Sequence, residues 1–267
     1  MNEQRITIKG LTDEEINYEF RKLEKLQINS TDGSTFIPLT IILDLSGSMN
    51  PYYSTVKKII GKMNEFLALI QSRNFTLTII SIWNSKARVM YFGALKDFSY
   101  EEFLRVLPEK CAGKTPLADA YDKAKQILES VESAYKSNKA KKFNYTIPVV
   151  FSVTDSAATD DEDFKSKVSE YCKNKIMENN MLLVEFVTDS NPDGLNLGGY
   201  KVPIDGENTD DAIAEFFTIL TFASTAVQSD ESIYIPDKTN RFEYNRYRSD
   251  VFLINFKFAF EKLMSKD

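Results

Sequence analysis

The feature that most constrains this chain is an apolar run that stops abruptly at a carboxylate. Residues 37–43 are almost all β-branched or aliphatic, and Asp44 follows them directly. Such a run is typical of a strand that is covered on both faces of a parallel sheet. In open α/β sheets, ligands bind beyond the carboxyl ends of the strands. We therefore predict that a site begins at Asp44.

Two hydroxyl side chains follow this carboxylate. Asp44, Ser46 and Ser48 are spaced two residues apart, so their side chains point to one side if the backbone is extended. Gly47 permits a tight backbone between the two serines. We expect the three side-chain oxygens to converge beyond the end of the strand.

Strand and helix patterns alternate along most of the chain. The predicted strands are 37–43, 75–83, 87–92, 147–153 and 181–187, and the predicted helices are 11–27, 56–70, 100–108, 117–135, 160–177 and 209–227. The second and third strands, joined by the turn Asn84-Ser85, are expected to be antiparallel. Residues 191–206, rich in Gly, Asn and Pro, are predicted to be a loop. The alternation predicts an α/β fold with a mostly parallel sheet and helices on both faces.

Two predicted helices begin with recognisable capping residues. Thr12 followed by Glu15 forms the pattern of a capping box. Thr115 precedes Pro116, which suits the first turn of a helix, so Thr115 is a candidate cap. From residue 231 onward the apolar spacing fits both a strand and a helix, and we favour a helix that packs on the domain.

Composition narrows the chemistry. The chain has no histidine, which excludes Ser-His-Asp and Cys-His nucleophile systems and histidine-based zinc sites. A bound metal would therefore be held mainly by oxygen, which suits Mg²⁺, Mn²⁺ or Ca²⁺. Cys111 and Cys172 are the only cysteines and are interpreted as free thiols.

Charge and hydropathy bear on partners and location. The formal net charge is -6 and no extended basic cluster stands out, which argues against binding nucleic acid. No apolar run approaches the roughly 20 residues that a membrane span requires. The first residues lack the pattern of a signal peptide. We therefore expect a cytoplasmic protein.

Two further side chains complete a pattern. The strand predicted at 147–153 is followed closely by a second carboxylate, Asp155, and Thr115 lies in a loop before a helix. Together with Asp44, Ser46 and Ser48, these residues fill in order the Asp-x-Ser-x-Ser, Thr and Asp positions of one known site. The chain thus resembles the von Willebrand factor A (vWA) family and its metal-ion-dependent adhesion site (MIDAS).

The resemblance carries expectations about fold and organisation. It implies a vWA, Rossmann-like, three-layer fold, with a mostly parallel central sheet and one antiparallel edge strand. The vWA domain would span residues 37–228. Residues 1–36 would form a helical segment and linker, and residues 229–267 an extension that packs on the domain.

The resemblance also implies a function. The expected ligands of the divalent cation are Asp44, Ser46, Ser48, Thr115 and Asp155. Mg²⁺ is the first candidate, with Mn²⁺ or Ca²⁺ as alternatives. The expected role is non-catalytic, metal-dependent binding of a partner protein that supplies an Asp or Glu.

Within the family, the chain looks most like the bacterial tellurite-resistance TerY type. Residues 150–161 and 209–217 carry this likeness. It implies an intracellular stress-response or signalling complex whose partner is a kinase or phosphatase of the same operon. Ser156 departs from the family pattern, which usually has Gly after the second Asp, and predicts a slightly altered loop.

The ligand pattern has a physical rationale of its own. Mg²⁺ prefers about six oxygen ligands and usually keeps some water. If Ser46, Ser48 and Thr115 bind the ion directly, and Asp44 and Asp155 act largely through water, the ion keeps positive charge. An open position would then attract a carboxylate of a partner.

Simpler roles exist for each of these residues. Ser46 and Ser48 could cap the following helix, Thr115 could cap its own helix, and the two carboxylates could bind backbone amides. The occurrence of all five in this order favours the metal site over five independent structural roles.

Other functions were weighed against this one. A phosphatase of the haloacid-dehalogenase type also begins with a strand ending in Asp, which would be Asp44, but it needs a second carboxylate where this chain has Ser46. Gly113-Lys114-Thr115 matches only the end of a phosphate-binding loop. A secreted or surface vWA adhesin is disfavoured because no leader is recognised.

Overall fold

The computed structural model describes most of the chain as far as residue 203. The described ranges are 10–29, 35–70, 75–137, 144–145, 147–178, 180–188 and 194–203. The helix predicted at 209–227 and the C-terminal extension at 229–267 lie outside these ranges. The division into residues 1–36, 37–228 and 229–267 therefore stays a prediction.

One mixed sheet forms the centre of the molecule, and its strands follow the order β3-β2-β1-β5-β6-β7. In chain order the described strands are β1 (Thr35–Asp44), β2 (Phe75–Trp83), β3 (Lys86–Ala94), β4 (Asn144–Tyr145), β5 (Val149–Thr154), β6 (Leu182–Val187) and β7 (Tyr200–Pro203). All described pairings are parallel except that of β2 with β3, and β4 pairs with the start of β1.

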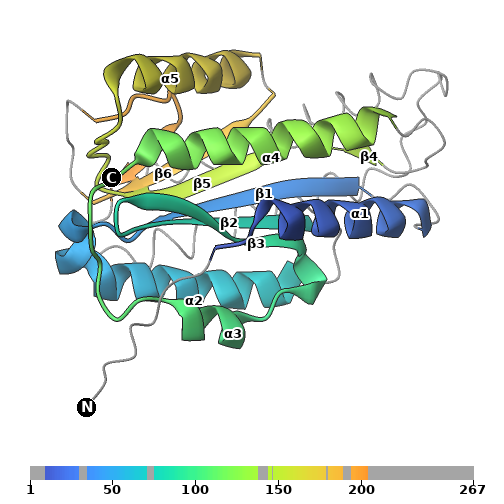
Figure 1. Ribbon diagram of the computed structural model, residues 1–267, viewed down its shortest axis with the longest axis horizontal. Coiled ribbons are helices and arrows are strands. Elements are labelled where there is room, and N and C mark those ends of the chain that lie inside the picture. Colours follow the sequence, from blue (N-terminus) through green and yellow to red (C-terminus); the bar gives the residue numbers. More distant parts are fainter. Residues whose placement is uncertain are drawn as a thin grey trace, which may run out of the picture.

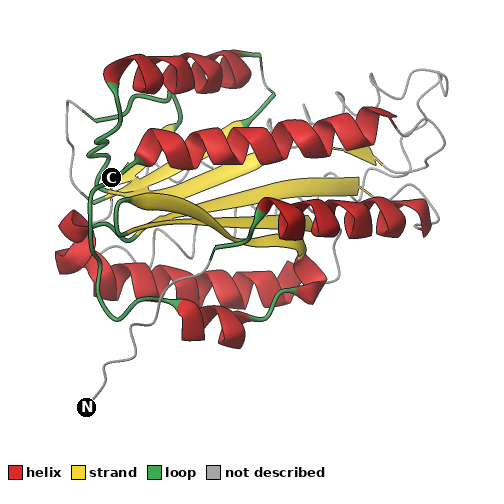
Figure 2. Ribbon diagram, viewed as in Figure 1, coloured by secondary structure: helices red, strands yellow, loops and turns green. Residues whose placement is uncertain are grey.

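Helices cover both faces of the sheet (Figures 1 and 2). The described helices are α1 (Asp13–Asn29), the 3₁₀ helix η1 (Gly47–Tyr52), α2 (Tyr53–Ile70), the 3₁₀ helix η2 (Leu95–Asp97), α3 (Tyr100–Val106), α4 (Leu117–Ser137) and α5 (Glu162–Met177). α2 and α3 pack on one face, while α1, α4 and α5 pack on the other. The predicted architecture of a mostly parallel sheet with one antiparallel edge strand between helical layers is confirmed.

β1 lies between the two helical layers, and its side chains alternate between them. Ile41 and Leu43 belong to the core under α2, whereas Ile42 belongs to the core under α4, and each has a relative exposure of 0%. An apolar residue is thus favoured at every position, because neither face reaches water. This explains the uninterrupted apolar run and places its end, Asp44, in the middle of the sheet.

Two strands escaped prediction. β7 lies inside the stretch predicted as a loop, where Tyr200 to Pro203 pair in parallel with Val184 to Val187 of β6. The loop prediction at 191–206 was therefore wrong for these four residues. Such a short edge strand has too few residues for a periodic pattern, and its pairing with β6 supplies the order that its own sequence does not. β4, with two residues, is shorter still.

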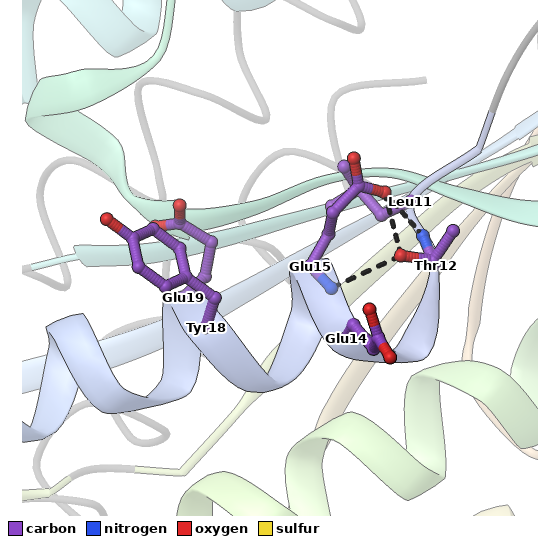
Figure 3. A pocket seen from close by; sticks show the side chains of 6 residues that line it. All are labelled: Leu11, Thr12, Glu14, Glu15, Tyr18 and Glu19. Atoms are coloured by element: carbon purple, nitrogen blue, oxygen red, sulfur yellow. Dashed lines mark hydrogen bonds between the residues drawn. The ribbon is translucent and has the colours of Figure 1, made fainter.

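The start of α1 carries the predicted capping box. The backbone N–H of Thr12 donates to Glu15 Oε2 (2.7 Å), and the backbone N–H of Glu15 donates to Thr12 Oγ1 (3.3 Å), as Figure 3 shows. Both interactions satisfy N–H groups that a helix start otherwise leaves open. α1 then packs on the sheet edge, where the rings of Phe20 and Phe92 lie 4.5 Å apart.

Candidate metal site

Asp44 is the first residue of the candidate site, and it is fully buried at the carboxyl end of β1, with a relative exposure of 0%. Its carboxylate accepts a hydrogen bond from the backbone N–H of Ser46 (Oδ1, 2.9 Å). It accepts another from the hydroxyl of Thr154 on the adjacent strand β5 (Oδ2, 2.8 Å). Each carboxylate oxygen thus has one partner, and the side chain is held in one orientation.

Ser46 directly precedes η1, and Ser48 lies in the first turn of η1. Ser46 is buried and Ser48 is exposed, and their Oγ atoms are 3.1 Å apart. Ser46 occupies the N-cap position of η1, yet its side chain makes no capping hydrogen bond. The simple capping role is therefore absent for Ser46. The two hydroxyls lie together, as the spacing of two residues predicts.

Asp155 directly follows β5, the strand next to β1. Because Leu43 pairs with Val153, the two carboxylates leave neighbouring strands at the same end of the sheet. Asp155 is buried, with a relative exposure of 8%, and its Oδ1 accepts a hydrogen bond from the backbone N–H of Ala157 (3.0 Å). The two strand ends therefore lie side by side.

The residue after Asp155 shows why glycine is common there. Ser156 has a φ of 62°, in the left-handed region of backbone conformation that residues other than glycine rarely adopt. Its side chain is buried, and its hydroxyl has no hydrogen-bond partner among the described residues. The loop keeps a glycine-like backbone, which a serine adopts only with local strain. An altered loop relative to the family pattern stays a prediction.

Thr115 reaches the same region from a third loop. Two backbone hydrogen bonds place it: Gly47 N–H donates to the carbonyl of Gly113 (2.9 Å), and Thr159 N–H donates to the carbonyl of Thr115 (2.9 Å). Thr115 therefore lies between the serine loop and the segment after Asp155. Its side chain is buried, with a relative exposure of 3%.

The predicted role of Thr115 as a helix cap was wrong. The carboxylate of Asp160 caps α4 from outside the helix, accepting hydrogen bonds from the backbone N–H groups of Ala118 (2.9 Å) and Asp119 (3.1 Å). The caps of a helix start usually lie just before it in sequence, so this one, from 42 residues downstream of Ala118, had no local signal. The Thr115 side chain is consequently not needed for capping.

The electrostatics of the site favour a cation. Burial raises the pKa of Asp44 to about 6, and the charge of nearby Asp155 adds to the increase, while hydrogen bonds from Ser46 and Thr154 oppose it. Among the described residues, the groups that shift the pKa of Asp44 include no Lys or Arg. Two carboxylates thus lie close together without a positively charged side chain from the described residues between them.

The donor set fits a hard divalent cation. It consists of two carboxylates and three hydroxyls, and Mg²⁺, Mn²⁺ and Ca²⁺ prefer such oxygen ligands. Within the described ranges, no group of three or more His, Cys, Asp or Glu side chains is placed to hold a metal. A site with only two carboxylates does not depend on such a group, because hydroxyls and water complete its coordination.

Two residues that sequence reasoning did not assign to the site also shape it. Thr154 orients Asp44, and Asp160 takes over the capping of α4. For Thr154 the sequence offered only a weak signal, a hydroxyl residue directly before Asp155 at the end of a strand that also contains Ser152. Of the residues around the predicted ion, Tyr52 is half-buried, whereas Lys114 and Thr159 are exposed.

Comparison with known proteins identifies structural likeness only. No protein-family model matches the sequence, and no curated protein matches it. Among solved structures, the vWA domain of SpRpn10 is 15% identical, with a TM-score of 0.43, covering 67% of this chain and 93% of that one. Manganese-loaded TRAP of Plasmodium vivax is 16% identical, with a TM-score of 0.41, covering 68% and 72%.

A third similar structure is an aerotolerance-related membrane protein from Bacteroides fragilis. It is 12% identical, with a TM-score of 0.40, and the match covers 66% of this chain and 94% of that chain. At such low identity these similarities do not assign a function to the chain. Within the part of the chain that the structure describes, every helix is too short or too polar to cross a membrane.

A hollow beside α1 was considered as a second site. It is lined by Leu11, Thr12, Glu14, Glu15, Tyr18 and Glu19 (Figure 3). Its carboxylates are largely committed within the helix, because Glu15 binds Thr12 and Glu19 forms an ion pair with Lys22 (2.7 Å). We assign no ligand to this hollow.

Proposed function

We propose that this chain is a vWA domain protein whose five residues form a MIDAS. It would act as a metal-dependent protein-interaction module and not as an enzyme. The observation that carries this proposal is Asp44, a wholly buried carboxylate beside a second carboxylate. Among the described residues, no Lys or Arg is named as a cause of its pKa shift. A bound divalent cation would balance the two negative charges.

The five residues would have two different roles at the ion. Ser46, Ser48 and Thr115 offer hydroxyl oxygens for direct contact with the ion. Asp44 and Asp155 supply negative charge, and both are already oriented by hydrogen bonds from their surroundings. Hydroxyl ligands carry no charge, so an ion held directly by them attracts an anionic group from outside. The partner would therefore contribute an Asp or Glu.

The ion and the biological setting are part of the same proposal. Mg²⁺ is the first candidate, because it keeps water ligands and tolerates few protein contacts, with Mn²⁺ or Ca²⁺ as alternatives. The likeness of residues 150–161 and 209–217 to the TerY type supports an intracellular bacterial stress-response or signalling complex. A kinase or phosphatase of the same operon would then be the partner.

Thermal unfolding with and without metal tests the ion. Titrating Mg²⁺ or Mn²⁺ into protein that a chelator has freed of metal is expected to raise the melting temperature. A metal ion at a concentration of 100 times its Kd stabilises the folded state by about 2.7 kcal/mol. Ser46→Ala and Asp155→Ala should abolish this shift. Ser54→Ala, at an exposed position of α2, is the matched control. If saturating metal does not change the melting temperature of the wild type, the proposed metal site is refuted.

A pull-down tests the partner. Immobilised protein should capture its partner from the native cell extract in the presence of Mg²⁺ and release it when a chelator is added. Ser46→Ala should capture none. Hydrolysis of a generic phosphate ester that disappears in Asp44→Asn would instead favour the phosphatase alternative, for which Ser46 is an unsuitable general acid or base.

A further inference from the structure

The side chain of Asn50 joins two loops that are distant in the sequence. Its Nδ2 donates to the carbonyl of Cys111 (2.9 Å), and its Oδ1 accepts from the backbone N–H of Cys111 (3.1 Å). Nδ2 also donates to the carbonyl of Gly47 (3.0 Å). One amide thus binds both backbone groups of a residue 61 positions away and the backbone of its own turn.

These two loops carry three of the candidate ligands. Gly47 lies between Ser46 and Ser48, and Cys111 begins the segment that leads to Thr115. Backbone hydrogen bonds run alongside the Asn50 contacts: Ala112 N–H donates to the carbonyl of Leu45 (3.0 Å). The distance between the serines and Thr115 therefore depends on how firmly these loops are joined.

The far side of the same loop is held by the turn between β2 and β3. The backbone N–H of Lys114 donates to Ser85 Oγ (2.8 Å). Gly113 has a φ of +85°, and a Cβ there would meet the backbone N of Ser85 at 2.3 Å. The loop thus runs between η1 and this turn, and Asn50 supplies the side-chain contacts on the η1 side.

We propose that Asn50 is a positioning residue, which holds the Thr115 loop against the serine loop and thereby sets the affinity of the site for its cation. This inference rests on the proposed metal site. Outer contacts that orient ligands typically change metal affinity by about 10- to 100-fold when removed. Asn50 itself is exposed, so its replacement does not open a cavity in the core.

Cys111 provides a reporter that does not depend on function. Cys111 is buried, with a relative exposure of 2%, and the side chain of Asn50 forms hydrogen bonds with both its backbone N–H and its carbonyl. Cys172 is similarly buried, at 3%, but it is part of α5 and belongs to the other core. Alkylation of Cys111 therefore measures opening of the loop, and alkylation of Cys172 in the same molecule measures general unfolding.

The test compares Asn50→Ala with wild-type protein in two measurements. Mn²⁺ affinity is obtained from the free-ion signal in electron paramagnetic resonance, and alkylation of each cysteine by iodoacetamide is followed by peptide mass spectrometry without metal. We expect Asn50→Ala to weaken Mn²⁺ binding at least tenfold. We also expect it to speed alkylation of Cys111 about tenfold or more, because lost hydrogen bonds no longer oppose opening. Cys172 should not change.

Two variants serve as controls. Asn174→Ala removes an exposed amide from α5 and should change neither measurement. Asn50→Asp keeps the acceptor for the N–H of Cys111 but loses both donors, so the alkylation rate should fall between those of wild type and Asn50→Ala. It also decides the question if Asn50→Ala does not fold.

The outcomes separate this inference from the proposed function. If Asn50→Ala binds Mn²⁺ as tightly as the wild type while Ser46→Ala does not bind it, the positioning role is overturned and the proposed metal site stands. Weakened binding with unchanged alkylation of Cys111 also overturns it, because the effect would not act through the loop. Absence of Mn²⁺ binding by the wild type overturns both.

Discussion

Two buried carboxylates on the same face of the sheet have contrasting surroundings. Asp44 ends β1, where hydrogen bonds from Ser46 and Thr154 hold it and a second carboxylate lies nearby. Glu185 lies within β6, and neither of its oxygens has a hydrogen-bond partner among the described residues. Both are fully buried, with a relative exposure of 0%. The comparison separates an oriented carboxylate, which we propose as part of a metal site, from a carboxylate that is enclosed without hydrogen-bond partners among the described residues.

The groups that face Glu185 explain how it is tolerated. Ser152 and Lys201 are its cross-strand partners on the neighbouring strands. The charge of Glu185 also contributes to the raised pKa of Tyr121 on α4 and of Cys172 on α5. Burial raises the pKa of Glu185 to about 7, and Lys201 only partly opposes the increase. Near neutral pH a large fraction of Glu185 is therefore protonated.

The difference teaches that burial alone does not make a carboxylate functional. Asp44 accepts hydrogen bonds from Ser46 and Thr154 and stands at the end of a strand, where the loop of the two serines begins. Glu185 is covered by helices and lacks oriented partners. Both have a raised pKa, which means that the position of the group in the fold, and not its pKa, identifies the site.

The strongest test of this contrast removes each charge in turn. Asp44→Asn should lower the affinity for Mn²⁺ by roughly 10- to 100-fold, because it removes a negative charge and one oriented oxygen from the site. Glu185→Gln, the matched change at the other buried carboxylate, should leave the affinity unchanged. Isothermal titration calorimetry measures both. Equal loss in the two variants would show that buried charge in general, and not the strand end, governs binding.

A second test concerns stability and its dependence on pH. Burial raises the pKa of Glu185 from its ordinary value of 4.5 to about 7 in the folded protein, so the folded state holds this proton more tightly than the unfolded state. Stability from this group is present below pH 4.5 and is lost as the pH rises through 7. Glu185→Gln should therefore stabilise the protein at pH 8 by about 1 to 3 kcal/mol and have little effect at pH 4.

Urea unfolding at the two pH values measures this effect. Asn180→Gln, an exposed change outside the core, controls for altered amide content. A Glu185→Gln protein that is less stable at pH 8 would mean that the ionised carboxylate has a partner in the folded state.

The smallest expected effect concerns the loop after Asp155. Ser156→Gly should stabilise the protein by about 0.5 to 1 kcal/mol, because glycine adopts the left-handed backbone without strain and no buried hydroxyl is left unpaired. The affinity for Mn²⁺ should stay within about twofold, since Asp155 keeps its hydrogen bond from the N–H of Ala157. Thermal unfolding measures the first quantity and calorimetry the second. Destabilisation would indicate that the Ser156 hydroxyl has a role that its surroundings do not explain.

Much of the fold was predictable because its signals are local. The apolar run before Asp44, the helical stripes of α2 and α4, and the capping box at Thr12 and Glu15 depend on neighbouring residues alone. β7 and the capping of α4 by Asp160 were not predicted, because each depends on a partner far away in the sequence.

The candidate ligands were likewise predictable as residues but not as a geometry. Asp44, Ser46 and Ser48 form a short motif. Thr115 was placed by its position in a loop before a helix, and Asp155 by its position after a strand. That all five act as ligands stays a prediction. The hydrogen bond from Thr154 to Asp44 and the clamp of Asn50 on Cys111 required the folded chain, since nothing in either local sequence indicates the other.

By itself, the sequence determined an α/β fold and the strand end at which the candidate ligands gather, because the pattern of apolar residues is a property of the chain as written. The absence of histidine likewise determined that the candidate metal ligands are oxygens. Only the tertiary structure decided which carboxylate is oriented and which is merely enclosed. Asp44 and Glu185 differ in their neighbours across the sheet, and those neighbours are brought together by strand pairing between segments more than 100 residues apart, such as Asp44 and Thr154 with a separation of 110.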